Sequence, residues 1–404
     1  MSLLPTARVV FHTLRHELAD RVRRAWRSAA HRDRKLRIGV DIRPFYEPLT
    51  GVGWYLYYLL HELAKNDDVE LYLFGDARIT DDGPRLHADV PANAKLCTFD
   101  LRGLPATRVS RPLTAGAYVA WIALADCDVL FGANFFLPRL HAAVAKRRVI
   151  TIHDLTYKRF PELVQKETLE NLERHMMREI AVADAIVCVS ESTRRELLRS
   201  YDIDPPRAVT IHSGLGRPAV SEPLEGLPSR YVLFVSTIEP RKDLGTLIDA
   251  YERLRERGAY DGSLVVVGKV GWKARELVPR LRGRGIVHLD YVRAPQLATI
   301  YERAEAFVFP SIYEGFGFPL LEAMARGVPS IAARSSSLPE IGGDAALYFE
   351  PRDVEGLVAQ LTRVLNDATL RAELSRRGRE RAAEFRWERA ARETLAVFRR
   401  VAES

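Results

Sequence analysis

Strand-like and helical segments alternate along most of this chain, and no other feature constrains its fold as strongly. Short apolar runs such as Leu36–Val40, Val149–His153 and Ala306–Phe309 are separated by longer segments with helical periodicity. Strands that alternate with helices predict parallel sheets covered by helices on their faces. We therefore predict an α/β fold.

The alternation stops once, in the proline- and glycine-rich segment Gly214–Ser229, and then restarts. Such a segment is typical of a linker, and 404 residues exceed the size of one ordinary hydrophobic core. We predict an N-terminal extension over residues 1–35, a first domain over 36–215 and a second domain over 216–385. The last segment, 386–404, is predicted to be a helix that can cross back to the first domain.

The excess positive charge lies in the first 37 residues. They hold ten Lys/Arg and three Asp/Glu, which accounts for the whole net charge of +7 and leaves the remainder neutral. A neutral remainder disfavours a nucleic-acid-binding protein. Residues 8–30 have the periodicity of a basic amphipathic helix, which fits either an anionic membrane surface or the protein's own surface. Its apolar arc consists of Val10, Leu14, Leu18, Val22 and Trp26.

The compartment is predicted from what the sequence lacks. It has no run of about 18 uncharged apolar residues and no apolar core of a signal peptide near its start. The cysteines, Cys97, Cys127 and Cys188, are odd in number and lie in apolar contexts, as reduced thiols do. We expect a cytoplasmic protein, at the inner face of the plasma membrane if residues 8–30 bind lipid.

Two adjacent cations follow one predicted strand of the second domain. Arg241 and Lys242 lie in Ser236–Asp243, between a buried strand and a helix. Ligands of parallel α/β sheets bind beyond the carboxyl ends of the strands, and an arginine fork beside a lysine suits phosphate oxygens. The alternative interpretation is an ordinary solvated loop.

A second unusual segment, residues 310–322, follows another strand of that domain. Glycines, including Gly317, allow close approach of backbone amides to a ligand, and a helix is predicted to start at Pro319. Glu314 and Glu322 are separated by seven residues, and both are suited to accept hydrogen bonds from sugar or ribose hydroxyls. Read separately, a glutamate before a helix is also consistent with a cap, and the aromatic residues with core packing.

These segments, taken together and in their order along the chain, resemble the motifs of the retaining glycosyltransferases of family 4. Those enzymes have the GT-B fold, in which two Rossmann-like domains face each other across a cleft. The resemblance covers roughly residues 36–390. It rests on Glu314 and Glu322 in EGFGFPLLEAMARGVP and on the phosphate-binding loop in its TIEPRKD form, with ADAIVCVSESTRREL and IHSGLG in the first domain. Many members carry an arginine where this chain has Thr237, so Arg241 is expected to supply the second cation beside Lys242.

The resemblance implies roles for these residues. Glu322 would hold the ribose and Glu314 the hydroxyls of the donor sugar. Arg241 and Lys242 would bind the diphosphate. The resemblance also implies further donor-site positions: the backbone amides around Gly317 and Phe318, the nucleobase site near Gly268, Lys269, Tyr291 and Val292, the glycine loop with Gly51 and Gly53, and His153 facing the donor sugar. His153 is also consistent with a strand-end histidine bonded to nearby backbone.

No metal or other cofactor is expected. Asp126-Cys127-Asp128 has the form of a metal-binding Asp-x-Asp, but it precedes a predicted strand and would lie at the wrong end of the sheet. No histidine pair has zinc-site spacing, and no phosphate loop of the ATPase type is present.

The function predicted from these features is metal-independent transfer of a hexose, with retention of configuration, from a nucleotide sugar to a saccharide acceptor. The TIEPRKD form resembles bacterial mannosyltransferases of surface-polysaccharide synthesis. GDP-mannose is therefore the first expectation for the donor, and a lipid-linked saccharide for the acceptor. The alternatives are a UDP-sugar-dependent transferase, a nucleotide-sugar epimerase, a sugar phosphorylase, or a non-catalytic nucleotide-sugar sensor of the same fold.

Overall fold

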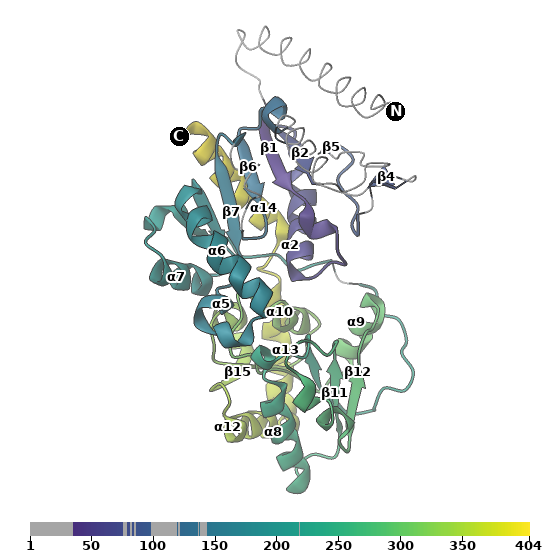
Figure 1. Ribbon diagram of the computed structural model, residues 1–404. Coiled ribbons are helices and arrows are strands. Elements are labelled where there is room, and N and C mark those ends of the chain that lie inside the picture. The colour runs from purple at the N-terminus through teal and green to yellow at the C-terminus, as the bar shows by residue number, and fades with distance from the viewer. Residues whose placement is uncertain are drawn as a thin grey trace, which may run out of the picture.

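The computed structural model describes residues 35–75, 79–80, 83–84, 86–97, 119, 122–135, 137, 144–217 and 219–404. The amphipathic segment 8–30 lies outside the described residues. In Figure 1 the chain forms two α/β halves, one above the other, each built around its own sheet.

The first sheet has seven strands, all parallel, in the order β5-β2-β1-β6-β7-β8-β9. Its strands are mostly continuous apolar runs, as expected for strands covered on both faces. They are β1 (Leu36–Asp41), β2 (Val69–Phe74), β5 (Lys95–Cys97), β6 (Val129–Gly132), β7 (Arg148–Ile152), β8 (Ala185–Cys188) and β9 (Ala208–Thr210). A separate short antiparallel pair consists of β3 (Ile79–Thr80) and β4 (Gly83–Pro84).

The helices that accompany this sheet include α2 (Gly51–Leu63), α5 (Thr156–Arg159), α6 (Lys166–Val182) and α7 (Glu191–Ser200). Helix α7 begins directly after Ser190, whose side chain caps it by accepting a hydrogen bond from the Thr193 backbone N–H at 3.0 Å.

The second sheet has six parallel strands in the order β12-β11-β10-β13-β14-β15. They are β10 (Tyr231–Val235), β11 (Ser263–Val267), β12 (Ile286–Leu289), β13 (Ala306–Phe309), β14 (Ser330–Ala333) and β15 (Ala346–Phe349). Its helices are α8 (Leu244–Glu256), α9 (Ala294–Glu302), α10 (Phe318–Ala325), α11 (Leu338–Gly342), α12 (Val354–Asn366) and α13 (Ala368–Ala382). Both sheets therefore have the strand order of a doubly wound Rossmann-like fold, which confirms the predicted fold class.

The chain passes between the halves twice, and the two crossings touch. Leu215 donates its backbone N–H to the carbonyl of Phe385 at 2.9 Å, and a side chain at Gly214 would collide with Trp387. After the second crossing, α14 (Trp387–Glu403) packs against α2 and the first sheet. The buried ring of Phe398 lies 5.2 Å from that of Phe131. Burial of one such side chain contributes about 1.5–3 kcal/mol, so the terminal helix holds the two halves together.

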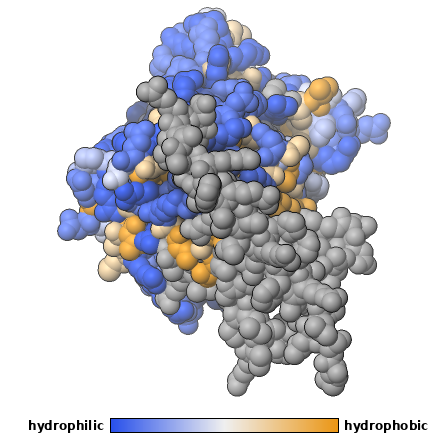
Figure 2. Space-filling view, turned by 90° about the horizontal axis from the view of Figure 1, so that it is seen from above, coloured by the Kyte–Doolittle hydropathy of each residue, from blue (hydrophilic) through white to orange (hydrophobic). Residues whose placement is uncertain are grey.

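Apolar side chains fill the interior of both halves, and all three cysteines are buried and free. Seen from above, the described part of the surface is mainly hydrophilic, with small separate hydrophobic groups (Figure 2). Among the described residues, no helix is long and apolar enough to cross a membrane.

Candidate active site

The two motifs of the second domain meet at the point where its strand order reverses. The strand β10 lies between β11 and β13, so helices leave β10 and β13 toward opposite faces of the sheet. The segment with Arg241 and Lys242 follows β10, and the segment with Glu314 follows β13. This reversal opens a crevice at the carboxyl ends of the strands, where ligands of open α/β sheets bind.

A cavity of about 640 Å³ lies between the two domains at this point. Its volume falls within the range of small-molecule sites, about 300–1,000 Å³. The first domain contributes the start of α2 and the end of β7, and the second contributes both motifs and part of α9. The predicted site residues that line it are Gly51, His153, Arg241, Lys242, Glu314, Gly317, Phe318 and Glu322.

The carboxylate of Glu314 is held between the two cations. Its Oε1 lies 2.5 Å from Nζ of Lys242, and its Oε2 accepts a hydrogen bond from Nη1 of Arg241 at 3.0 Å. Arg241 also donates to Glu239 at 2.8 Å and to the carbonyl of Tyr313 at 2.7 Å. Most of the guanidinium donors thus bind protein groups, whereas the Lys242 ammonium donates to Glu314. In this geometry Arg241 positions Glu314, and Lys242 is the cation that a ligand can bind in place of Glu314.

The protonation states follow from this cluster. Burial would raise the pKa of Glu314, but Arg241 and Lys242 more than offset this and lower it to about 2. Burial and the neighbouring guanidinium lower the pKa of Lys242, while burial raises the pKa of Glu239. Glu314 is therefore ionised near neutral pH, and the cluster of two carboxylates and two cations has no net charge when both cations are protonated.

Glu322 has a different environment on the same wall. It is the fifth residue of α10, which begins at Phe318, one residue before the predicted start at Pro319, and whose N-cap is Gly317 at φ +109°. The hydroxyl of Tyr301 donates to Oε2 of Glu322 at 3.1 Å. Burial raises the pKa of Glu322 to about 7. One wall of the cavity thus holds a fixed carboxylate and a second one that titrates near neutral pH.

The first domain presents His153 from the end of β7. Its Nε2 lies 2.7 Å from the carbonyl of Ala133, so this nitrogen carries the proton. Burial lowers the pKa of His153, which keeps the ring neutral. Tyr55 packs edge-on against the ring at 4.9 Å, whereas the neighbouring Asp154 accepts the Thr156 backbone N–H at 2.9 Å.

The two walls touch directly beside the cavity. The carbonyl of Gly315 accepts hydrogen bonds from the hydroxyls of Ser190 at 2.6 Å and Thr193 at 3.2 Å. Gly315 itself lies against the carbonyl of His153, at a distance that leaves no room for a Cβ. The glycine is therefore required for the donor loop and His153 to approach one another.

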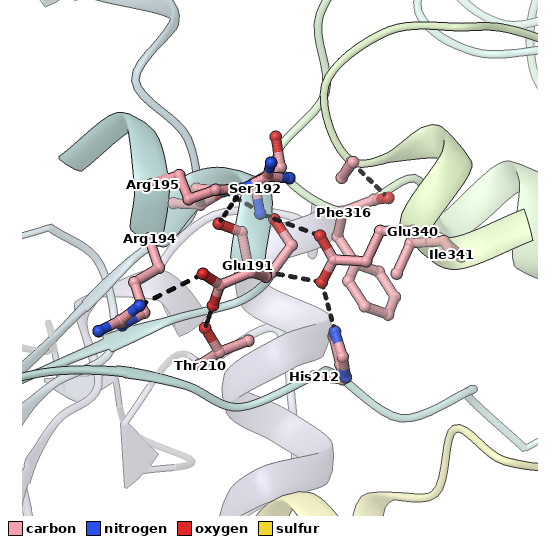
Figure 3. A network of polar contacts seen from close by, with 12 residues as sticks. Glu191, Ser192, Arg194, Arg195, Thr210, His212, Phe316, Glu340 and Ile341 are labelled. Carbon is pink, nitrogen blue, oxygen red and sulfur yellow. Dashed lines mark hydrogen bonds and ion pairs between the residues drawn. The ribbon is translucent and has the colours of Figure 1, made fainter. Parts of the chain in front are cut away.

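A second contact between the domains joins Glu340 to the start of α7 (Figure 3). Its carboxylate accepts the backbone N–H groups of Glu191 at 2.7 Å and Ser192 at 2.9 Å, and Nε2 of His212 lies 2.6 Å from Oε1. A carboxylate from one domain thus satisfies the free amides at the helix N-terminus of the other, where the helix dipole favours negative charge. Burial would raise the pKa of Glu340, but these hydrogen bonds lower it.

Two family models match the chain. The model described as Glycosyltransferase Family 4 matches residues 49–215, and the model described as Glycosyl transferases group 1 matches residues 221–381. An Escherichia coli protein, O-antigen chain mannosyltransferase B, is 32% identical over 384 residues, covering 90% of this chain and all of the relative.

The chain belongs to the family 4 glycosyltransferases. It is a glycosyltransferase enzyme, and solved structures agree on its fold. Sucrose-phosphate synthase from Thermosynechococcus elongatus matches with a TM-score of 0.70 at 22% identity, covering 92% of this chain and all of that one. Anabaena Alr3699/HepE, solved with UDP and glucose, matches with a TM-score of 0.66 at 15% identity, covering 90% and 99%.

Five predicted donor-site residues of this glycosyltransferase, Lys269 among them, do not line the cavity. Gly53 packs inside α2, where a Cβ would lie 2.9 Å from Leu49, so this glycine serves packing. Gly268 ends β11 at φ +143° with its backbone against Ser236. The other two, Tyr291 and Val292, precede α9, and Tyr291 is 74% exposed.

Aromatic residues that the sequence did not single out line the first-domain side of the glycosyltransferase cavity. Trp54 is stacked on Tyr58 at 5.8 Å, and Tyr58 is stacked on Trp387 at 5.6 Å. Trp54 remains 45% exposed. The spacing of Trp54 and Tyr58, one helical turn apart and directly after the glycine loop, is the signal that could have identified them.

The Asp-x-Asp sequence lies where its position predicted, directly before β6 and at the opposite edge of the sheet from the cavity. Lys146 pairs with Asp126 at 2.8 Å, and Asp128 accepts the Arg37 backbone N–H at 3.0 Å. Within the part of the chain that the structure describes, no cluster of three His, Cys, Asp or Glu residues is arranged to hold a metal ion.

Proposed function

We propose that this enzyme transfers a hexose from a nucleotide sugar to a saccharide acceptor, with retention of configuration and without a metal ion. The observation that carries the proposal is the Glu314 carboxylate held between Lys242 and Arg241, in a cavity that also contains Glu322. Paired carboxylates suit hydroxyl groups, and a buried lysine beside a helix N-terminus suits phosphate.

The donor diphosphate would bind at Lys242 and at the backbone amides that begin α10. In the free enzyme Glu314 neutralises this lysine. A diphosphate that takes the ammonium would release one oxygen of Glu314 to accept donor-sugar hydroxyls, while Arg241 still holds the other oxygen. The ribose would then reach Glu322, further along the same helix.

The chemical step breaks the bond between the anomeric carbon and the diphosphate. Negative charge grows on the departing phosphate, and Lys242 with the amides at the start of α10 would stabilise it. The acceptor hydroxyl attacks from the face that the phosphate leaves, and its proton passes to a phosphate oxygen. This route gives retention and requires no protein nucleophile. Glu314, with its low pKa and two cation contacts, would bind sugar hydroxyls and would not donate a proton.

The acceptor would lie against the aromatic stack on the first domain. An exposed indole such as Trp54 presents a flat apolar face of the kind that packs against the C–H face of a sugar ring. Tyr58 stacks on Trp54, and Trp387 stacks on Tyr58. A saccharide acceptor also agrees with the name of the Escherichia coli relative, an O-antigen chain mannosyltransferase. We propose synthesis of a cell-surface polysaccharide or glycolipid as the setting.

Mannose from GDP-mannose is the donor we propose, because the relative that matches 90% of the chain is named as a mannosyltransferase. The UDP and glucose bound to Anabaena Alr3699/HepE favour a UDP-sugar as the second candidate. We also propose that residues 8–30 bind an anionic membrane and bring a lipid-linked acceptor to the cavity.

A panel of nucleotide sugars tests the proposal. Purified enzyme is incubated with GDP-mannose, UDP-glucose, UDP-galactose and UDP-N-acetylglucosamine in excess EDTA, and thermal shift and donor hydrolysis are measured. We expect GDP-mannose to stabilise the protein most and to be turned over. If only a UDP-sugar stabilises the protein, that UDP-sugar and not GDP-mannose is the donor. A requirement for added manganese or magnesium would refute metal independence.

A further inference from the structure

A second cavity, of about 570 Å³, lies between the same two domains and shares no lining residue with the donor cavity. The first domain contributes the end of α5 and one face of α7 to it. The second domain contributes segments after β13, β14 and β15. The chain itself separates the two cavities, because Tyr313 lines this one and the next residue, Glu314, lines the other.

Positive charge dominates this second cavity. Arg159, Arg195 and Arg199 line it from the first domain and Arg352 from the second, against one carboxylate, Glu196. Over the described ranges of the chain, none of these four guanidinium groups forms an ion pair with a carboxylate. Arg241, by contrast, pairs with two carboxylates. All four arginine side chains are exposed, and the charge of Arg352 also acts on the carboxyl group of Asp243. The cavity lining nevertheless carries a surplus of positive charge.

Local structure directs these groups to one place. Ser192, Arg195 and Arg199 recur at helical spacing, so one face of α7 carries all three. Two like charges four residues apart destabilise an isolated helix, and a bound anion would relieve that repulsion. Figure 3 shows Ser192 and Arg195 in the first turns of α7, next to the Glu340 contact.

The opposite wall contains strained backbone. Ser336 and Arg352 are non-glycine residues with φ of +43° and +65°, and both line this cavity. Residues in this region cost free energy and persist where the surrounding structure holds them, often in binding sites. The hydroxyl oxygen of Ser336 accepts the Glu314 backbone N–H at 2.7 Å, so its own hydrogen remains available to a ligand.

We propose that this cavity binds a phosphorylated ligand, which links the two domains. A planar guanidinium fork matches phosphate oxygens, and several such groups suit a multiply charged phosphoryl group better than a single carboxylate. The rings of Phe160 and Tyr313, 5.9 Å apart and tilted by 64°, form an apolar wall suited to a sugar or a short apolar portion. Because arginines of both domains contact the same anion, the ligand would stabilise the domain arrangement in which the donor cavity is assembled.

Binding of glucose 6-phosphate, measured by isothermal titration calorimetry against neutral glucose, tests this site. The full-length protein is compared with Arg199→Ala, Arg352→Ala, Lys242→Ala and the exposed control Arg376→Ala. We expect saturable binding of the phosphate ester only, weakened at least about tenfold by Arg199→Ala and by Arg352→Ala. Lys242→Ala and Arg376→Ala should bind like the wild type.

No saturable binding to the wild type would overturn the inference, and so would equal binding by Arg199→Ala, Arg352→Ala and the wild type. Loss of binding in Lys242→Ala alone would also overturn it, by placing the phosphate in the donor cavity. This comparison does not depend on the nature of the donor, so its failure would leave the proposed transferase reaction intact.

The phosphoryl group can belong to a soluble sugar phosphate or to a lipid headgroup, and vesicles separate these sources. Phosphatidylcholine vesicles with and without a prenyl diphosphate are sedimented with the wild type and with Arg199→Ala. If the protein sediments with the vesicles only when the diphosphate is present and Arg199 is intact, the cavity binds the phosphoryl group of a lipid. If sedimentation does not depend on Arg199 and the calorimetric result above holds, the cavity binds the soluble ester.

Discussion

Gly315 lies against the main-chain oxygen of His153, across the boundary between the two domains. A methyl group at position 315 would collide with that oxygen, so the donor loop and the His153 strand would have to move apart. We predict that Gly315→Ala lowers kcat/KM on the order of 100-fold, because displacement of about 1 Å in a site can cost that much. Steady-state kinetics with the donor identified by the panel measures this.

Gly245→Ala is the matched control for this substitution. Gly245 lies in α8, and a Cβ there meets its nearest neighbour, Leu277, at an ordinary contact distance of 3.7 Å. We expect this variant to retain wild-type kinetics and to gain up to about 1 kcal/mol of stability from better helix propensity. Wild-type activity in Gly315→Ala would show that the domains need not meet at this point for catalysis.

The carboxyl group of Glu322 should make stability depend on pH. Its folded-state pKa is raised to about 7 from the ordinary 4.5, so the folded protein binds this proton more tightly than the unfolded chain does. The stability that this group contributes is complete below about pH 4.5 and is lost as the pH rises through 7. Its size is about 3 kcal/mol at most, and water in the cavity reduces it.

Glu322→Gln removes this titration. We expect the Tm of the variant, relative to that of the wild type, to rise between pH 5 and pH 8 in scanning calorimetry. Glu350→Gln, which changes an exposed carboxylate of the same domain, should show no such trend. A constant difference between Glu322→Gln and wild type across this range would mean that Glu322 does not titrate between pH 5 and pH 8, contrary to the prediction.

The exposed ring of Trp54 should matter for the acceptor and not for the donor. We predict that Trp54→Ala raises the KM for a saccharide acceptor about tenfold, the effect of about 1.4 kcal/mol, through loss of a stacking surface. Donor hydrolysis in the absence of acceptor should stay at the wild-type rate, and Trp54→Phe should recover most of the affinity. Equal acceptor KM values in wild type and Trp54→Ala would exclude the aromatic stack as the acceptor platform.

The basic extension can be tested by deletion. Each basic residue near an anionic surface contributes about 1 kcal/mol at best, so we expect reversible, salt-sensitive binding of the full chain to anionic liposomes. Deletion of residues 1–34 should release the protein from liposomes and leave transfer to a soluble acceptor unchanged. If the truncated protein loses its thermal transition, the apolar arc packs on the protein itself, and equal liposome binding by both forms would exclude the extension as the anchor.

Much of the fold could be predicted from the sequence, because strands buried on both faces appear as uninterrupted apolar runs. The run YVLFV of β10 is one example, and the residues after it and after β13 could be placed at one edge of the sheet from the topology alone. That placement puts Lys242 and Glu314 near each other although 72 positions separate them.

The pairing within the site could not be predicted in the same way. Glu314 binds both cations, and Arg241 also donates hydrogen bonds to Glu239 and Tyr313. These contacts depend on side-chain positions that are fixed only when the loop folds. The packing of Gly53 against Leu49 could not be predicted either, because the sequence does not distinguish a glycine that packs against a side chain from one that faces a ligand. The contact of Glu340 with the start of α7 could not be predicted for a related reason. The two groups are 149 positions apart, so no local sequence pattern indicates that this carboxylate caps the helix.

The most direct test of the donor site is calorimetric titration of GDP and UDP into wild type and Lys242→Ala in excess EDTA. Lys166→Ala, at an exposed position of α6 outside the donor cavity, is the control. We predict that the wild type and Lys166→Ala bind one of the two nucleotides without metal. Lys242→Ala should bind it at least about tenfold more weakly, since a charge-assisted bond to the diphosphate is lost. Equal affinity in wild type and Lys242→Ala, or binding only after manganese or magnesium is added, would contradict the account.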